Sequence, residues 1–272
     1  MDSAACDVEG IADLYGLGIR LGFYFQWISS LLVTLFCQED EPLYRAVNLL
    51  LQLAVFVCLV FLSATGAIHA PEVLVAFWML IGALSSLTGD VISPFGTASG
   101  AARLLMYAAL SVYGCWFWFG GLETLPGFLC GGTPLFFGGD IANGPLRTLG
   151  KVVSVLGLLA CTSLLVYSAF LAWKRMQDNG SGDMKTTTSR ARPQTEIPLL
   201  AISVAVIALS IASMERLVRE NQLVGVDDLF AAGQIIPFIV GLAGLVNTVV
   251  PVVLFGKFLK PRCWLVFRHH LT

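Results

Sequence analysis

Charge is scarce in this chain of 272 residues, because Asp, Glu, Lys and Arg make up only 12% of it, against 57% for hydrophobic residues. Ordinary soluble domains carry about 25% charged and about 45–50% apolar residues. A water-soluble surface cannot be built from this composition, so we expect lipid to be the main solvent. The formal net charge of −2 also lacks the basic excess that is typical of nucleic-acid binding, and we expect no nucleic-acid partner.

The motifs of common enzyme and metal sites are missing as well. The sequence has no Gly-x-Ser-x-Gly elbow, no His-Glu-x-x-His and no Cys-x-x-Cys, which disfavours hydrolases and leads us to expect no metal and no cofactor. The last apolar run has no interior Lys for a retinal Schiff base, since Lys257 lies at its inner end. The first fifteen residues carry no Lys or Arg, so we expect no cleaved signal peptide and a first span that is kept as an anchor.

Apolar runs of about twenty residues, the length that crosses a bilayer as a helix, are the dominant pattern. Only helices or closed barrels satisfy the backbone in lipid, and runs such as 152–167 are apolar on all sides instead of alternating, which excludes a barrel. The turn-rich segment 90–100 separates the third run from the fourth, and loss of both would leave five spans. The sequence predicts an all-α membrane protein, a bundle of about seven transmembrane helices near residues 16–37, 46–67, 72–91, 101–120, 149–173, 197–219 and 230–257.

Lys and Arg in short loops stay on the cytoplasmic side, so their distribution predicts the orientation. With the N-terminus outside, four flank the outer ends, and the cytoplasmic side holds eleven: Arg45, Arg103, Lys174, Arg175, Lys185, Arg190, Arg192, Lys257, Lys260, Arg262 and Arg268. We therefore expect an outer N-terminus and a cytoplasmic C-terminus, with a flexible cytoplasmic loop at 177–196, an outer loop at 121–148 and a cytoplasmic tail at 259–272. The predicted location is a plasma membrane or endomembrane.

Seven cysteines divide between the two sides, and in this orientation only Cys6 and Cys130 lie outside. Disulfides persist in oxidising compartments, so a Cys6–Cys130 bridge is predicted to tie the N-terminal segment to the outer loop. The alternative is two unpaired thiols that never approach within bonding range.

Polar residues at membrane depth gather at the outer end of three spans. Ionisable groups cost about 3 kcal/mol at the centre of a span, so they face the bundle or water and often mark function. One interpretation is a helix end that emerges among the lipid headgroups. The sharper hypothesis is an outward-facing polar cavity that binds a small molecule or ion through Arg20, Gln26, Glu215, Asn221 and Gln234.

Three motifs carry a resemblance: DLYGLGIRLGFYFQW at Asp13–Trp27, ERLVREN at Glu215–Asn221 and GQIIPFIVG at Gly233–Gly241. With them, the chain resembles a large family of uncharacterised filamentous-fungal multi-pass integral membrane proteins. The resemblance touches three spans and matches the general layout along most of the chain. It implies a multi-pass fold and brings no activity with it.

Two classes of function stay open. The first is a non-enzymatic receptor, channel or transport-like protein with the polar cavity described above. The second is an intramembrane enzyme of fungal secondary metabolism, such as a terpene cyclase, in which a buried Glu215 or Asp90 protonates a hydrophobic substrate. Aromatic faces would stabilise the cation, although lipid-facing or belt positions are the commoner role for them: Trp27, Phe77, Trp78 and Trp116. The expected partners are membrane lipids and a hydrophobic small molecule.

Overall fold

The computed structural model describes residues 8–36, 40–83, 98–126, 135–142, 144–178, 196–229 and 232–255. These residues are mostly helical, which confirms the all-α class. The helices are α1 Ala12–Tyr15, α2 Leu17–Phe36, α3 Glu41–Thr65, α4 Ala70–Gly82, α5 Ala98–Trp116, the π-helical turn η3 Phe117–Gly121, α6 Leu122–Thr124, α7 Pro145–Asp178, α8 Glu196–Glu220 and α9 Ala232–Phe255. The short strands are β1 Val8–Glu9, β2 Leu135–Phe136, β3 Gly139–Asp140 and β4 Leu223–Val224.

Six of the helical stretches are long and apolar enough to cross a membrane, and each lies at one of the predicted spans. The structure describes only residues 72–83 of the third predicted span, 72–91, so the count of about seven stays a prediction. The helix there, α4, has 13 residues, which reach about 20 Å against a hydrocarbon core of about 30 Å. It begins at a capping box of His69 and Glu72, and residues 84–97 lie outside the described part of the chain. The six are Ala12–Phe36, Glu41–Thr65, Gly100–Thr124, Pro145–Leu171, Leu200–Glu220 and Gly233–Val250.

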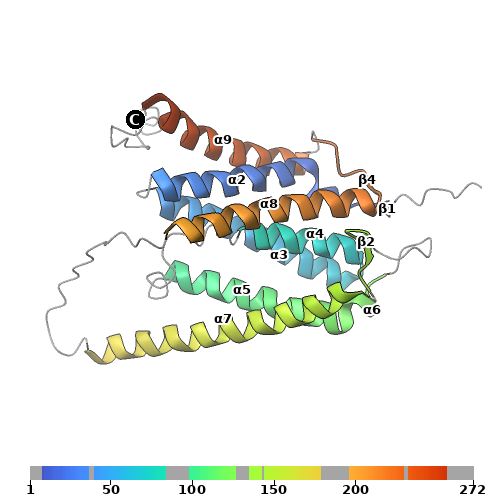
Figure 1. Cartoon of the computed structure of the whole chain (residues 1–272), viewed down its shortest axis with the longest axis horizontal. Helices are drawn as coiled ribbons and strands as arrows, with labels where there is room; N and C mark the ends of the chain where they lie inside the picture. The colour runs from blue at the N-terminus through green and yellow to red at the C-terminus, as the bar shows by residue number, and fades with distance from the viewer. Residues whose placement is uncertain are drawn as a thin grey trace, which may run out of the picture.

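The helices lie side by side with nearly parallel axes (Figure 1). The closest packing joins α2 to α9, α4 to α8 and α5 to α7, while α3 contacts both α2 and α4. Helix α4 lies inside the bundle with most of its side chains buried. The described part of the chain therefore forms a bundle around α4, with α7 and α9 at opposite edges.

Helices α2 and α9 approach at glycines, as the small residues in both spans predict. A Cβ built on Gly22 would lie 2.4 Å from the carbonyl oxygen of Pro237, and one on Gly241 would lie 2.3 Å from the carbonyl oxygen of Gly22. Any side chain would force the two backbones apart. Glycine at these positions is therefore a condition for the packing of α9 on α2.

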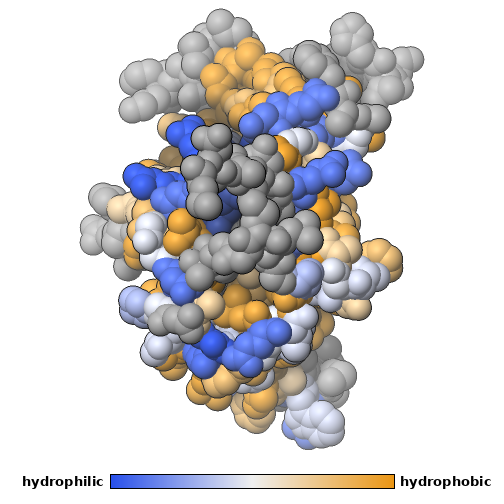
Figure 2. All heavy atoms as spheres, turned by 90° about the vertical axis from the view of Figure 1, so that its right-hand side faces the viewer, coloured by the Kyte–Doolittle hydropathy of each residue, from blue (hydrophilic) through white to orange (hydrophobic). Residues whose placement is uncertain are grey.

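Short strands gather at one end of the bundle, where α2 begins and α8 ends (Figure 1). Strands β1 and β4 pair in parallel, and β2 and β3 form an antiparallel hairpin. Figure 2 views this end directly, and hydrophilic residues lie across it between apolar flanks. Under the predicted orientation this is the outer end.

The boundaries of the predicted loops shift. The outer loop, predicted from residue 121, begins later because the helical path continues through η3 and α6 to Thr124, and its described part holds the β2–β3 hairpin. Helix α7 extends to Asp178, so it covers the first residues of the predicted loop 177–196. The remainder of that loop to residue 195 and the tail 259–272 lie outside the described residues.

Candidate functional site

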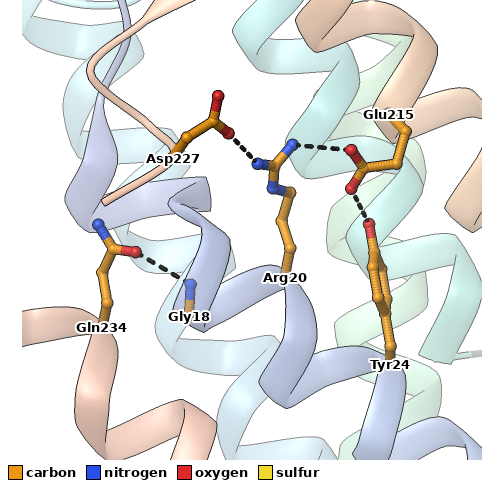
Figure 3. Close-up of polar contacts among 6 residues, drawn as sticks. All are labelled: Gly18, Arg20, Tyr24, Glu215, Asp227 and Gln234. Atoms are coloured by element: carbon orange, nitrogen blue, oxygen red, sulfur yellow. Dashed lines mark hydrogen bonds and ion pairs between the residues drawn. The ribbon is translucent and has the colours of Figure 1, made fainter. Parts of the chain in front are cut away.

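Arg20 lies in the first turn of α2 and is 1% exposed. Its Nη1 lies 3.4 Å from Oε2 of Glu215 near the end of α8, and its Nη2 lies 2.9 Å from Oδ1 of Asp227 in the segment after β4 (Figure 3). A buried guanidinium needs paired partners because its charge cannot be neutralised by loss of a proton. Arg20 therefore joins the start of α2 to two segments that lie 195 and 207 residues further along the chain.

Glu215 has a second partner on α2. The hydroxyl of Tyr24, one turn further along that helix, donates to Oε1 of Glu215 at 2.9 Å (Figure 3). The Tyr24 ring in turn contacts Trp27 at 5.7 Å between centroids. We call Arg20, Tyr24, Glu215 and Asp227 the arginine cluster.

The arginine cluster extends from the interior to the surface. Side-chain exposure rises from 1% at Arg20 to 31% at Glu215 and 79% at Asp227. Two carboxylates face one guanidinium, so the formal charges leave one negative charge in excess. The cluster is thus an acidic site that the bundle covers at Arg20 and that is exposed at Asp227.

Gln234, predicted to converge on the same cavity, has a different contact. Its Oε1 accepts a hydrogen bond at 3.0 Å from the backbone N–H of Gly18 (Figure 3). This N–H is in the first turn of α2 and has no acceptor within its own helix. Gln234 therefore caps α2 from α9, and its amide carbon would lie 2.3 Å from a Cβ on Gly16.

The other two predicted ligand residues also make separate contacts. The Gln26 amide donates to the backbone oxygen of Tyr44 on α3 at 3.4 Å. The Asn221 amide exchanges hydrogen bonds with the backbone of Leu135, 2.9 Å to the N–H and 2.8 Å to the carbonyl oxygen. Of the five predicted residues, the structure brings Arg20 and Glu215 into direct contact and gives the other three structural partners.

Sequence reasoning missed the exposed Asp227 and also a fully buried carboxylate, Glu72. Glu72 is fully buried at the start of α4, where Oε1 accepts from the Tyr15 hydroxyl at 2.8 Å and from the Ile11 N–H at 3.1 Å. Its Oε2 accepts from the His69 N–H at 2.8 Å and lies 3.1 Å from the His69 ring. The structure shows Glu72 at the third position of α4 with His69 at its cap, although His69 is not one of the Ser or Thr residues that mark a capping box in a sequence.

Several predicted residues lie outside the described part of the chain, namely Asp90, Cys6 and Cys130. Their roles as acid and as disulfide partners stay predictions. The cysteines Cys58, Cys115 and Cys161 are unpaired, and the described residues hold no group of three His, Cys, Asp or Glu suited to a metal ion.

The aromatic residues proposed for cation stabilisation pack largely against other rings. Phe77 contacts Tyr113 and Phe117, Trp78 stacks on Phe136, and the buried Trp27 contacts Phe23 and Tyr24. Trp116 contacts Tyr113 and is 42% exposed at the surface. These rings contact one another, and Glu215 is bonded to Arg20 and Tyr24. The contacts do not test the cyclase hypothesis, which stays a prediction.

Fold and site define a class: an all-α bundle whose six apolar helices are long enough to span a membrane, as in an integral multi-pass membrane protein. Comparison with protein-family profiles, curated proteins and solved structures found no match to the chain. The resemblance to the fungal membrane-protein family therefore stays a prediction.

Proposed function

We propose that this chain is a multi-pass membrane protein of receptor, channel or transport type that binds a small cation, organic or inorganic, at an outward-facing arginine cluster. One observation carries the proposal: Arg20, nearly fully buried in a span, is held between Glu215 and Asp227, of which Asp227 is 79% exposed. Ionisable groups inside spans are costly and commonly belong to ion or substrate paths.

The charge of the cluster favours a cation over an anion. Two carboxylates oppose a single guanidinium, and only Oδ1 of Asp227 accepts from Arg20. The second carboxylate oxygen of Asp227 points away from Arg20 in Figure 3. A positively charged ligand at this oxygen would complete the neutralisation.

The distribution of Lys and Arg supports an outer position for the cluster. Eleven of the sixteen basic residues fall on the side opposite to it when the N-terminus is placed outside. We expect the Asn-Gly-Ser sequon at Asn179 to stay unglycosylated in a eukaryotic host, because the loop faces the cytoplasm. A reporter fused after Thr272 tests the same orientation, and a lumenal or extracellular reporter would overturn it.

A thermal-shift titration tests the proposed binding. The full-length protein in detergent is titrated with tetramethylammonium and other small amines, with alkali-metal cations, and with small carboxylates at equal ionic strength. We expect at least one cation to raise the unfolding temperature, since ligand at 100 times its Kd stabilises by about 2.7 kcal/mol. The response is lost in Asp227→Asn and kept in Glu123→Gln, whose carboxylate pairs with Arg147 elsewhere. Stabilisation by carboxylates, or a cation response that survives Asp227→Asn, would overturn the proposal.

A further inference from the structure

The N-terminal segment Val8–Gly16, which we call the strap, crosses the end of the bundle that holds the arginine cluster. Its strand β1 pairs with β4, with Val8 opposite Leu223 and Glu9 opposite Val224. The Gly10 N–H extends this contact by donating to the carbonyl oxygen of Val224 at 2.9 Å. Figure 1 shows β1 and β4 together at this end.

A single side chain of the central helix holds the middle of the strap. Oε1 of Glu72 accepts the Ile11 N–H at 3.1 Å and the Tyr15 hydroxyl at 2.8 Å. Its other oxygen is engaged by His69 within α4 and its cap. Glu72 thus accepts two hydrogen bonds from the strap and attaches it to the start of α4.

The strap is also joined to the segment that carries Asp227. Just beyond its end, the Leu17 N–H donates to the carbonyl oxygen of Val226 at 2.8 Å. Val226 precedes Asp227, the exposed carboxylate of the arginine cluster. The strap and the start of α2 are therefore bonded to the segment 223–226, directly before Asp227.

Glycines flank the strap at the points where it changes direction. Gly16 has extended backbone angles (φ −58°, ψ 164°) and separates α1 from α2. A Cβ on Gly10 would lie 2.5 Å from the Tyr15 hydroxyl oxygen, and one on Gly16 would lie 2.3 Å from the Gln234 amide. The observed position of the strap thus requires glycine at residues 10 and 16.

We propose that the strap positions Asp227 at the arginine cluster and that Glu72 is the latch of the strap. Release of Ile11 and Tyr15 from Glu72 loosens the strap, and with it the 223–227 segment, so that Asp227 leaves Arg20 and the cation site is lost. Glu72 acts as a positioning residue and does not contact the ligand. This inference rests on the proposed function of the cluster and names its regulation.

Hydrogen exchange read by mass spectrometry tests the latch without any ligand. The full-length protein in detergent or nanodiscs is compared with Glu72→Gln and with Tyr15→Phe, which removes one hydrogen bond and keeps the ring. We expect Glu72→Gln to speed exchange of the Gly10, Ile11 and Leu17 amides about tenfold, and Tyr15→Phe to do so about threefold. Exchange in 222–228 should rise with them, while α9 stays unchanged.

Glu123→Gln is the matched control, because it removes a carboxylate charge whose partner is Arg147, away from the strap. Unchanged strap exchange in both variants would overturn the latch, and so would an equal rise in all helices, which would make Glu72 a general support of the fold. If Glu72→Gln fails to fold, Tyr15→Phe alone decides between these results. Because the readout needs no cation, faster strap exchange with no cation response would refute the binding proposal while leaving the latch intact.

Discussion

Helices α4 and α7 are both apolar, yet they occupy opposite environments. Helix α4 has 13 residues, and Leu80 on it is 1% exposed. Helix α7 has 34 residues, and Leu156 on it is 60% exposed, as are many of its other large apolar side chains. Lipid is as apolar as a protein core, so hydrophobicity does not draw a side chain inward in a membrane. Contact with neighbouring helices, and not hydropathy, decides which residues are buried.

The two helices also attach to the bundle by different means. α4 packs through large side chains such as Phe77 and Leu80. α7 packs on α5 and η3 through small residues, since a Cβ on Gly150 would lie 2.2 Å from the Trp118 ring and one on Gly157 would lie 3.0 Å from the Ser111 hydroxyl. This difference predicts that substitutions inside the bundle are costly and that those on the outer face of α7 are not.

The largest expected effect is that of Arg20→Met, which leaves Glu215 and Asp227 without their cation at the interior end of the cluster. The change removes two charge-assisted hydrogen bonds, each of which contributes about 1.5–3 kcal/mol, with the lower value expected here because both carboxylates are partly exposed. The matched change in α7 is Lys151→Met, which removes a cation over the Phe119 ring and costs about 0.5–1 kcal/mol. Thermal unfolding in detergent measures the stability loss of both variants. Equal losses would contradict the expected difference between the interior of the bundle and its edge.

The same chemical change in the two helices sharpens the comparison. Leu80→Ala in α4 opens a cavity in the core and costs about 3 kcal/mol of unfolding free energy. Leu156→Ala in α7 removes a side chain that protein leaves uncovered, and we expect a change within about 0.5 kcal/mol. Denaturant unfolding of the two variants in one detergent provides the measurement. A large loss for Leu156→Ala would mean that another protein surface covers α7.

A smaller effect is expected at the α2–α9 contact. Gly22→Ala places a methyl group against the Pro237 carbonyl, a backbone atom that cannot rotate away, and overpacking of this kind costs about 2 kcal/mol. Gly120→Ala is the control, since its Cβ would meet no described atom within 4 Å. The melting temperatures of both variants measure the two losses of stability. An unchanged melting temperature for Gly22→Ala would show that α9 adjusts its position.

Hydropathy and charge were sufficient to predict six spans, because the length of an apolar run is a property of local sequence. They also singled out Arg20 and Glu215 by depth, and these two residues do pair. Depth is only one coordinate, however. The direction in which a side chain points also depends on how its helix is rotated about its own axis, and contacts between distant segments set that rotation. Gln26 and Asn221 were therefore predicted to lie with Arg20, whereas the structure bonds them to other segments.

Two carboxylates at the end of the bundle where the short strands lie escaped prediction for different reasons. Asp227 lies in a connecting segment, where no periodic pattern indicates which side chain turns toward the bundle. Glu72 falls at the first residue of a predicted span, a place where charges are usually solvated, and its burial follows from the strap that folds over it. Its contact with Tyr15 depends on tertiary structure and could not be read from local sequence.

The smallest expected effect concerns Asn221, which joins the end of α8 to the β2–β3 hairpin. Asn221→Ala removes the paired hydrogen bonds to the Leu135 backbone and one to the Leu217 carbonyl oxygen. We expect a loss of about 1 kcal/mol, because water replaces much of this bonding at a partly exposed hairpin. Asn247→Ala on an exposed face of α9 is the control with the same change and should cause no loss. Limited proteolysis at 135–142 should accelerate in Asn221→Ala alone, and an unchanged cleavage rate would mean that the ring contact between Trp78 and Phe136 holds the hairpin without the amide.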